Sequence, residues 1–119
     1  MATFVHEGKY IDHIPGADVA AGAVVVQGDL VGVAPQAIAA NTLGSLTVEG
    51  VFDVARVTGV GTGITAGAKV YIIPSGDDAG KATKAADDGG TPATAYILAG
   101  KAVVAAGDSA ATVRVRLSQ

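Results

Sequence analysis

The chain has 119 residues, of which 50% are hydrophobic, 16% charged and 4% aromatic, and its formal net charge at pH 7 is -3. This length suits a single domain, and the acidic balance excludes the basic surface that nucleic-acid-binding proteins carry. The absence of Cys excludes disulfides and thiolate chemistry. With so few charges a small monomer would expose much apolar surface, so we expect a homo-oligomer.

Residues 1–14 are predicted to form an N-terminal arm, because polar and apolar side chains are interleaved there and the segment ends before Pro15 and Gly16. Such an arm is either an extended tail or the first strand of the domain. It lacks the features of a signal peptide, and no segment of the chain reaches the roughly 20 apolar residues of a membrane-spanning helix. We therefore expect a protein made in the cytoplasm with no membrane partner. Residues 15–119 are predicted to be one β-rich domain.

Four short units recur along the chain, each with a Gly between small, polar or apolar neighbours and followed by a β-forming stretch. Their glycines are Gly22, Gly44, Gly67 and Gly107. Gly adopts positive φ without steric cost, and β-branched residues favour extended strands. Each unit therefore predicts a tight turn that leads into a strand.

The first half of the domain is predicted to contain a hairpin. Residues 24–26 and 30–33 are apolar and flank Gly28, which indicates a tight turn between two strands. The Ala-rich residues 35–41 could form one helical turn, although they are too few for an independent helix.

Three further segments are predicted to be strands. Residues 46–57 are the longest β-type stretch, and Gly50 within it predicts a bulge or bend where the chain changes sheets. Residues 69–73 follow the third turn unit. Residues 96–105 are apolar, and we expect Gly100 and the Lys that follows it to interrupt this strand.

The end of the chain combines a long loop with the most regular strand. Residues 74–94 are rich in Gly, Asp and Pro, so we expect a loop that adds little to the core. Residues 112–117 alternate, with Val113, Val115 and Leu117 predicted to face inward. The sequence therefore predicts an all-β fold, a small β-barrel or β-sandwich-like domain of short strands with an N-terminal arm, one long loop and little helix.

Two Gly-containing patterns resemble nucleotide-binding motifs but lack essential residues. Gly59 and Gly61 begin a Gly-x-Gly pattern, yet Ile64 stands where the third Gly of a dinucleotide site is needed. Lys81 and Lys101 each follow a Gly without the Ser or Thr that binds Mg²⁺ in a P-loop. We expect no cofactor.

Metal and nucleophile sites are also not expected. His6 and His13 are seven residues apart, so on one extended strand they would face opposite sides. The Asp pairs at 77–78 and 87–88 lack the spacing of a calcium loop and are interpreted as solvated loop carboxylates. The Ser residues have no base in a recognisable motif, so we predict that the protein is not an enzyme.

Several segments, in their order and spacing, resemble the DUF2190 family of phage and prophage proteins. The segments that carry the resemblance are residues 21–26, 28–34, 48–54, 64–71, 106–108 and 113–117. The resemblance covers nearly the whole chain and implies a capsid decoration, or cement, protein on the virion surface. It also implies the major capsid protein as partner and, by analogy with decoration proteins, a homotrimer. The alternative is a carbohydrate-binding or host-binding β module on the virion, which the absence of Trp and the presence of only three Tyr disfavour.

The arm is the candidate contact with the capsid or with other subunits. An extended segment can add a strand to a neighbouring sheet, while its side chains fill pockets. The candidate binding residues are Phe4, Val5, His6, Tyr10 and Ile11.

Overall fold

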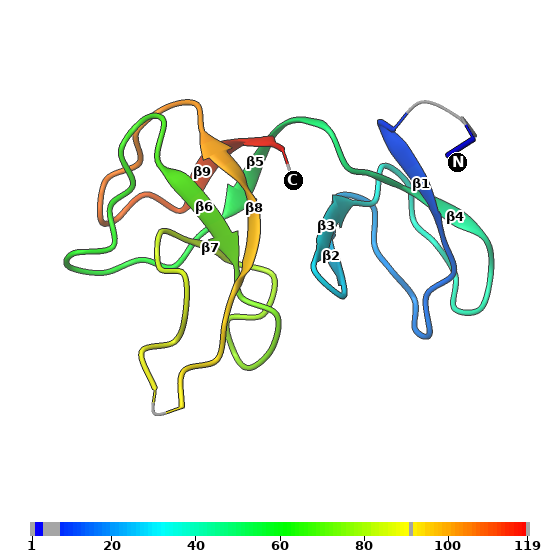
Figure 1. Cartoon of the computed structure of the whole chain (residues 1–119), viewed down its shortest axis with the longest axis horizontal. Helices are drawn as coiled ribbons and strands as arrows, with labels where there is room; N and C mark the ends of the chain where they lie inside the picture. The colour runs from blue at the N-terminus through cyan, green and yellow to red at the C-terminus, as the bar shows by residue number, and fades with distance from the viewer. Residues whose placement is uncertain (1, 4–7, 91, 119) are drawn as a thin grey trace.

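The computed structural model of the chain describes residues 2–3, 8–90 and 92–118. Over these residues it contains nine strands and no helix, which confirms the all-β prediction. The strands are β1 (Tyr10–His13), β2 (Val24–Gln27), β3 (Leu30–Val33), β4 (Gly44–Thr47), β5 (Gly50–Ala55), β6 (Lys69–Ile72), β7 (Ala82–Thr83), β8 (Ile97–Ala102) and β9 (Thr112–Leu117). They form two antiparallel sheets that lie beside each other (Figure 1). We call residues 10–47 the N-terminal unit and residues 50–117 the C-terminal unit.

The N-terminal unit is a four-stranded sheet in the order β1-β4-β3-β2. The predicted hairpin is present as β2 and β3, and Gly28 has φ 61° in the turn between the paired Gln27 and Leu30. The chain leaves this sheet after β4 and enters the other one at Gly50, whose φ is 137°. The predicted bend at Gly50 is therefore confirmed, and only Gly tolerates such a φ easily.

The C-terminal unit is a five-stranded sheet in the order β5-β9-β8-β6-β7. Its first and last strands approach each other, because Arg56 forms a parallel bridge with Ala82 and the Val57 amide donates to the Ala82 carbonyl over 3.0 Å. The sheet curls without closing into a barrel, and the whole fold is sandwich-like. In β9 the predicted alternation is confirmed, because Val115 is fully buried between exposed Arg114 and Arg116.

The two units repeat one topology. The order β1-β4-β3-β2 corresponds to β5-β9-β8-β6, with β7 as an addition. An isolated bridge precedes the turn in both units, Val19 with Ile38 in one and Ile64 with Ala106 in the other. The four predicted turn units therefore form two bridged pairs, one for each sheet.

Backbone hydrogen bonds repeat as well. The Gly22 amide donates a 2.7 Å hydrogen bond to the Ala34 carbonyl. In the other unit the Gly67 amide donates an equivalent 2.7 Å bond to the Ala102 carbonyl. The second of the four predicted turn units differs from expectation. Its residue with a left-handed backbone is Asn41, with φ 61°, and Gly44 lies three residues later. Asn tolerates this conformation better than most side chains.

The buried residues form two clusters. The larger combines inward-facing residues of the C-terminal unit with Val31 and Val33 of β3. The smaller consists of Ala34, Ile38 and Leu46, with Ile11 packed against it. One face of the β2–β3 hairpin thus joins the core of the C-terminal unit and holds the two sheets together.

Of the two predictions in the loops, the helical turn was wrong. Residues 35–41 form no helical turn, because Ile38 exchanges two 2.8 Å backbone hydrogen bonds with Val19. Tertiary pairing outweighs a weak local preference in so short a segment. Residues 74–94 add little to the core, as predicted, because Ala82 in β7 is the one buried residue among those that the structure describes there.

The expected interruption of the strand at residues 96–105 was also wrong. β8 continues through Gly100, which pairs with Val70 on one side and Leu117 on the other. A Cβ at this position would overlap the carbonyl oxygen of Arg116, so the strands can approach only because the residue is Gly.

Candidate functional site

The predicted binding residues fall partly on the outer strand of the N-terminal unit. Phe4, Val5 and His6 lie outside the described residues, whereas Tyr10 and Ile11 belong to β1. The Tyr10 side chain is 55% exposed, and Ile11 packs against the smaller cluster. Among the strands that the structure describes, β1 pairs with β4 alone, so its other backbone edge is available to a further strand. The separate arm of residues 1–14 stays a prediction.

A hollow lies beside this strand. It has a volume of about 580 Å³ and is lined by Asp12, His13, Ile14, Gln27 and Leu43. His13 Nδ1 and Gln27 Oε1 are 2.7 Å apart, so this hydrogen bond joins the two outer strands of the unit. Ile14 is 63% exposed and Leu43 67% exposed, which leaves apolar surface at this end of the molecule.

A second groove lies where the two units meet. It has a volume of about 410 Å³, and its lining includes Ile11, Leu30, Glu49 and Arg116. The N-terminal unit lines it with Ile11 and Leu30 and the C-terminal unit with Arg116, so a ligand or chain segment in this groove would touch both sheets.

The Gly-rich loop after β5 is held rigidly by Arg56. This side chain is 3% exposed, and its guanidinium donates to the carbonyls of Gly107 and Ala110 at 2.7 Å and of Thr62 at 2.5 Å. One Arg therefore joins the turn at residues 59–62 to the turn at residues 107–110. A planar, always charged guanidinium suits such a set of carbonyl acceptors.

Asp108 fixes the same loop from outside. Its carboxylate accepts hydrogen bonds from the amides of Gly61 at 3.2 Å and Gly63 at 2.7 Å. These bonds lower the pKa of Asp108 below its ordinary value. Directly before Gly61 the same loop presents Val60, which is 99% exposed. The Gly pattern that resembled a nucleotide site is thus a backbone loop closed by the protein's own carboxylate.

The Asp pairs of the long loop bind the loop itself. Asp88 accepts hydrogen bonds from the amides of Gly90 and Thr94, and these lower its pKa. Asp78 forms a 3.0 Å ion pair with Lys81. Within the described ranges no three His, Asp or Glu residues gather in a way that could hold a metal ion.

These features are a rigid β body, an outer strand with an available edge and exposed apolar groups. The family model described as phage cement protein matches residues 5–117 of this body. The chain belongs to the phage cement protein family. No curated protein and no solved structure matches it.

Membership in the phage cement protein family confirms the resemblance found in the sequence and implies a structural role at the phage capsid. Over the described residues, the fold contains no helix that is long and apolar enough to cross a membrane. The order of the strands gives this cement protein two similar units, each with its own outer strand.

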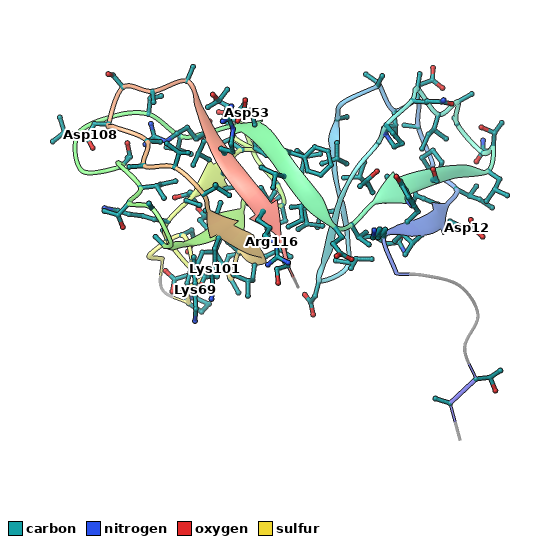
Figure 2. The ribbon with its side chains drawn as sticks, turned by 90° about the horizontal axis from the view of Figure 1, so that it is seen from above. Asp12, Asp53, Lys69, Lys101, Asp108 and Arg116 are labelled. Atoms are coloured by element: carbon teal, nitrogen blue, oxygen red, sulfur yellow. The ribbon has the colours of Figure 1, made fainter. Side chains whose placement is uncertain are left out.

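One charged surface was missed in the sequence. Lys69, Lys101 and Arg116 come from three strands, and Figure 2 shows them together on one side of the C-terminal unit. The alternation of β9 predicts that Arg116 faces outward, but it does not predict which residues stand opposite. That requires the register between strands, which depends on the bulge in β8 beside β6.

Proposed function

We propose that this protein is a phage or prophage capsid decoration protein that binds the major capsid protein and stabilises the shell as a homo-oligomer, with a trimer favoured. The match of the family model to residues 5–117 is the observation that carries the proposal. A role without catalysis agrees with the site geometry, because the polar groups that might have formed a nucleotide or metal site instead bind backbone groups of the chain.

The outer edge of β1 and the residues before it are the proposed contact with the shell. Tyr10 lies exposed on this strand, and its ring can enter an apolar pocket of the partner while the strand edge supplies backbone hydrogen bonds. Phe4, Val5 and His6 immediately precede this strand in the sequence.

Co-sedimentation with capsids of the cognate phage tests this contact. We expect the Tyr10→Ser variant, and a variant lacking residues 2–7, to remain folded but to pellet with capsids at least about tenfold more weakly, a loss of about 1.4 kcal/mol. Val60→Ser is the matched control, because it removes a more exposed apolar side chain from the other unit. Undiminished pelleting of both test variants would assign shell binding to another surface.

The same preparation separates the alternative function. A carbohydrate-binding or host-binding module would leave capsid stability unchanged and would bind cells or glycans instead. Capsids incubated with the protein are therefore expected to resist heat better than bare capsids, since a ligand that binds only the intact shell stabilises it.

A further inference from the structure

Three cations form a row across the outer face of the C-terminal sheet (Figure 2). Lys69 in β6 is paired in register with Lys101 in β8, and Lys101 is paired with Arg116 in β9. Residues paired in register project from the same face of a sheet, and neighbouring strands are about 4.8 Å apart. All three side chains are exposed. We call these three residues the cation row.

The other cations of the C-terminal unit already interact within the chain. Arg56 donates to backbone carbonyls, and Lys84 acts on Asp108, whose pKa it helps to lower. The remaining two form the ion pairs Lys81–Asp78 and Arg114–Asp53. Glu49 lines the same groove as Arg116, but the ion pairs among the described residues include neither of them. Because like charges directly opposite each other destabilise a sheet, the cation row costs stability in the isolated chain and is expected to gain it in a contact.

The duplicated topology shows that the corresponding face of the other unit is an interface. Val24 pairs with Val33 at the place in the β2–β3 hairpin where Lys69 pairs with Lys101 in the C-terminal unit. Val33 belongs to the larger core cluster and Val24 packs against it. The same face is therefore apolar and covered in the N-terminal unit, but cationic and uncovered in the C-terminal unit.

Apolar side chains flank the cation row. Tyr71 lies two residues after Lys69, hence on the same face, and is paired with Leu98, which is 40% exposed. At the other end of the row Val51 is paired with Arg116 and is 53% exposed. Apolar groups beside charged ones are typical of the surfaces that proteins present to other proteins, and aliphatic side chains add nothing to the binding of phosphate.

Nucleic acid fits this molecule poorly. Residues 1–49 contain five acidic residues and one Lys, so the N-terminal unit repels a long polyanion that lies across both units. The affinity of proteins for nucleic acid depends on how many phosphates they neutralise, and the cation row can neutralise about three. A short carboxylate-rich segment of a protein needs no more than the length of the row.

Most carboxylates of the chain are occupied by the chain itself, which argues against a second copy as the partner. Among the described residues, those that accept hydrogen bonds or form ion pairs are Asp18, Asp53, Asp78, Asp87, Asp88 and Asp108. The other described carboxylates come from four different segments and are Asp12, Asp29, Glu49 and Asp77. The set of carboxylates that matches the cation row is therefore expected on a different protein.

We propose that the cation row binds a carboxylate-rich segment of the shell protein, as a second contact in addition to the β1 edge. Charge complementarity selects this segment, while Tyr71, Leu98 and Val51 add apolar contact at the two ends of the row. The row lies on the other unit from β1, so each contact can be removed without the other. The inference rests on the proposed function and deepens it by specifying the chemistry of the partner surface.

A synthetic peptide of about ten Glu residues tests the preference for carboxylates without any capsid. In low salt at pH 7 we expect the peptide to shift the amide resonances of Lys69, Lys101 and Arg116, and Lys101→Glu to bind it at least about tenfold more weakly. Lys84→Glu is the matched control, because it makes the same charge change at an exposed residue outside the cation row. At about 1 M salt, where screening acts within about 3 Å, the shifts are expected to disappear. Unchanged resonances at the row, or equal binding by Lys101→Glu, would overturn the proposal.

Three competing partners are tested with the same variants. Single-stranded DNA of equal charge and vesicles of anionic lipid are expected to bind the cation row more weakly than the Glu peptide does. Tighter binding of either would assign the row to nucleic acid or to a membrane. Light scattering is expected to give the same mass for Lys101→Glu as for the natural chain, and a smaller mass would assign the row to a second copy. Each of these contrary results would overturn the proposal.

Co-sedimentation with capsids of the cognate phage tests the shell as the partner. In low salt Lys101→Glu is expected to pellet at least about tenfold more weakly than the natural chain, Lys84→Glu should pellet normally, and the difference should vanish at about 1 M salt. Because Lys101→Glu places an anion between two cations, its melting temperature is expected to be no lower than that of the natural chain, which separates a lost contact from a damaged fold. Equal pelleting of Lys101→Glu and the natural chain would overturn the proposal. A natural chain that does not pellet would overturn the proposed function and with it the shell as partner, whereas the peptide measurement would still decide the preference of the row for carboxylates.

Discussion

At the scale of single residues, Arg56 is the polar group on which the C-terminal unit depends most. Its guanidinium supplies the donors for carbonyls in two separate turns while remaining 3% exposed. Lys is a point charge and cannot satisfy these acceptors together, and each buried acceptor left without a donor costs about 1–3 kcal/mol. We therefore expect Arg56→Lys to lower the free energy of unfolding by about 2 kcal/mol in a urea titration.

The control for Arg56 is Arg114→Lys. Arg114 is half exposed and pairs with Asp53 on the surface, where an ion pair contributes about 0–1 kcal/mol. Equal midpoints for the two variants would contradict the role assigned to Arg56.

Asp108 makes stability depend on pH. Its pKa in the folded chain lies below the ordinary value of 3.8, because the Gly61 and Gly63 amides donate to the carboxylate. The contribution is therefore fully present above about pH 4 and is lost as the pH falls through the lowered pKa. Asp108→Asn is expected to melt lower at pH 7, and the difference from the natural chain should shrink as the pH falls below about 4.

A suitable control for Asp108 is Asp29→Asn in the β2–β3 turn, where no hydrogen bond to the carboxylate is described. It should melt like the natural chain at every pH. A constant difference between Asp108→Asn and the natural chain across the acid range would show that the carboxylate charge is not involved.

At the scale of elements, two glycines occupy the same place in the two sheets. Gly32 pairs with Val25 in β2, and Gly100 pairs with Val70 in β6. A Cβ added at Gly32 would lie 2.9 Å from the Cβ of Leu46. A Cβ added at Gly100 would overlap a backbone carbonyl oxygen. Because backbone yields less easily than a side chain, we expect Gly100→Ala to cost about 3 kcal/mol and Gly32→Ala less.

Thermal melts compare these variants with Gly107→Ala. A Cβ at Gly107 would contact nothing within 4 Å, so this change should have an effect of about 0.5 kcal/mol or less. A Gly100→Ala variant as stable as Gly107→Ala would mean that β8 and β9 can separate without loss.

The same elements show what the sequence can and cannot predict. Alternation in β9 and the turn at Gly28 were predicted correctly, because both depend on residues close in sequence. The bridge between Val19 and Ile38 was missed, since its partners are chosen by the fold rather than by local preference. The cluster of Lys69, Lys101 and Arg116 was missed for the same reason, because each is an ordinary surface residue until the register places it beside the others.

At the scale of the molecule, the duplicated topology does not divide the core equally. Counted over the described part of the chain, the cluster centred on the C-terminal unit contains thirteen buried residues, whereas the cluster within the N-terminal unit contains three. Two residues of the larger cluster, Val31 and Val33, come from β3. The N-terminal unit is thus stabilised largely by the hairpin that it packs onto the other sheet.

Native-state hydrogen exchange is expected to reflect this inequality. Segments that bury few apolar groups open at a lower free energy than those at the centre of the core. The amides of β8 and β9 should exchange slowest and only through global unfolding, while those of β1 should exchange at least about tenfold faster. β3 is expected to follow the C-terminal unit, because Val31 and Val33 belong to that core.

The control is exchange in rising urea, where the β1 amides should show a smaller dependence on denaturant than those of β9 if they open locally. Equal rates and equal denaturant dependence in both sheets would instead indicate that the two units unfold as one, despite the difference between their cores.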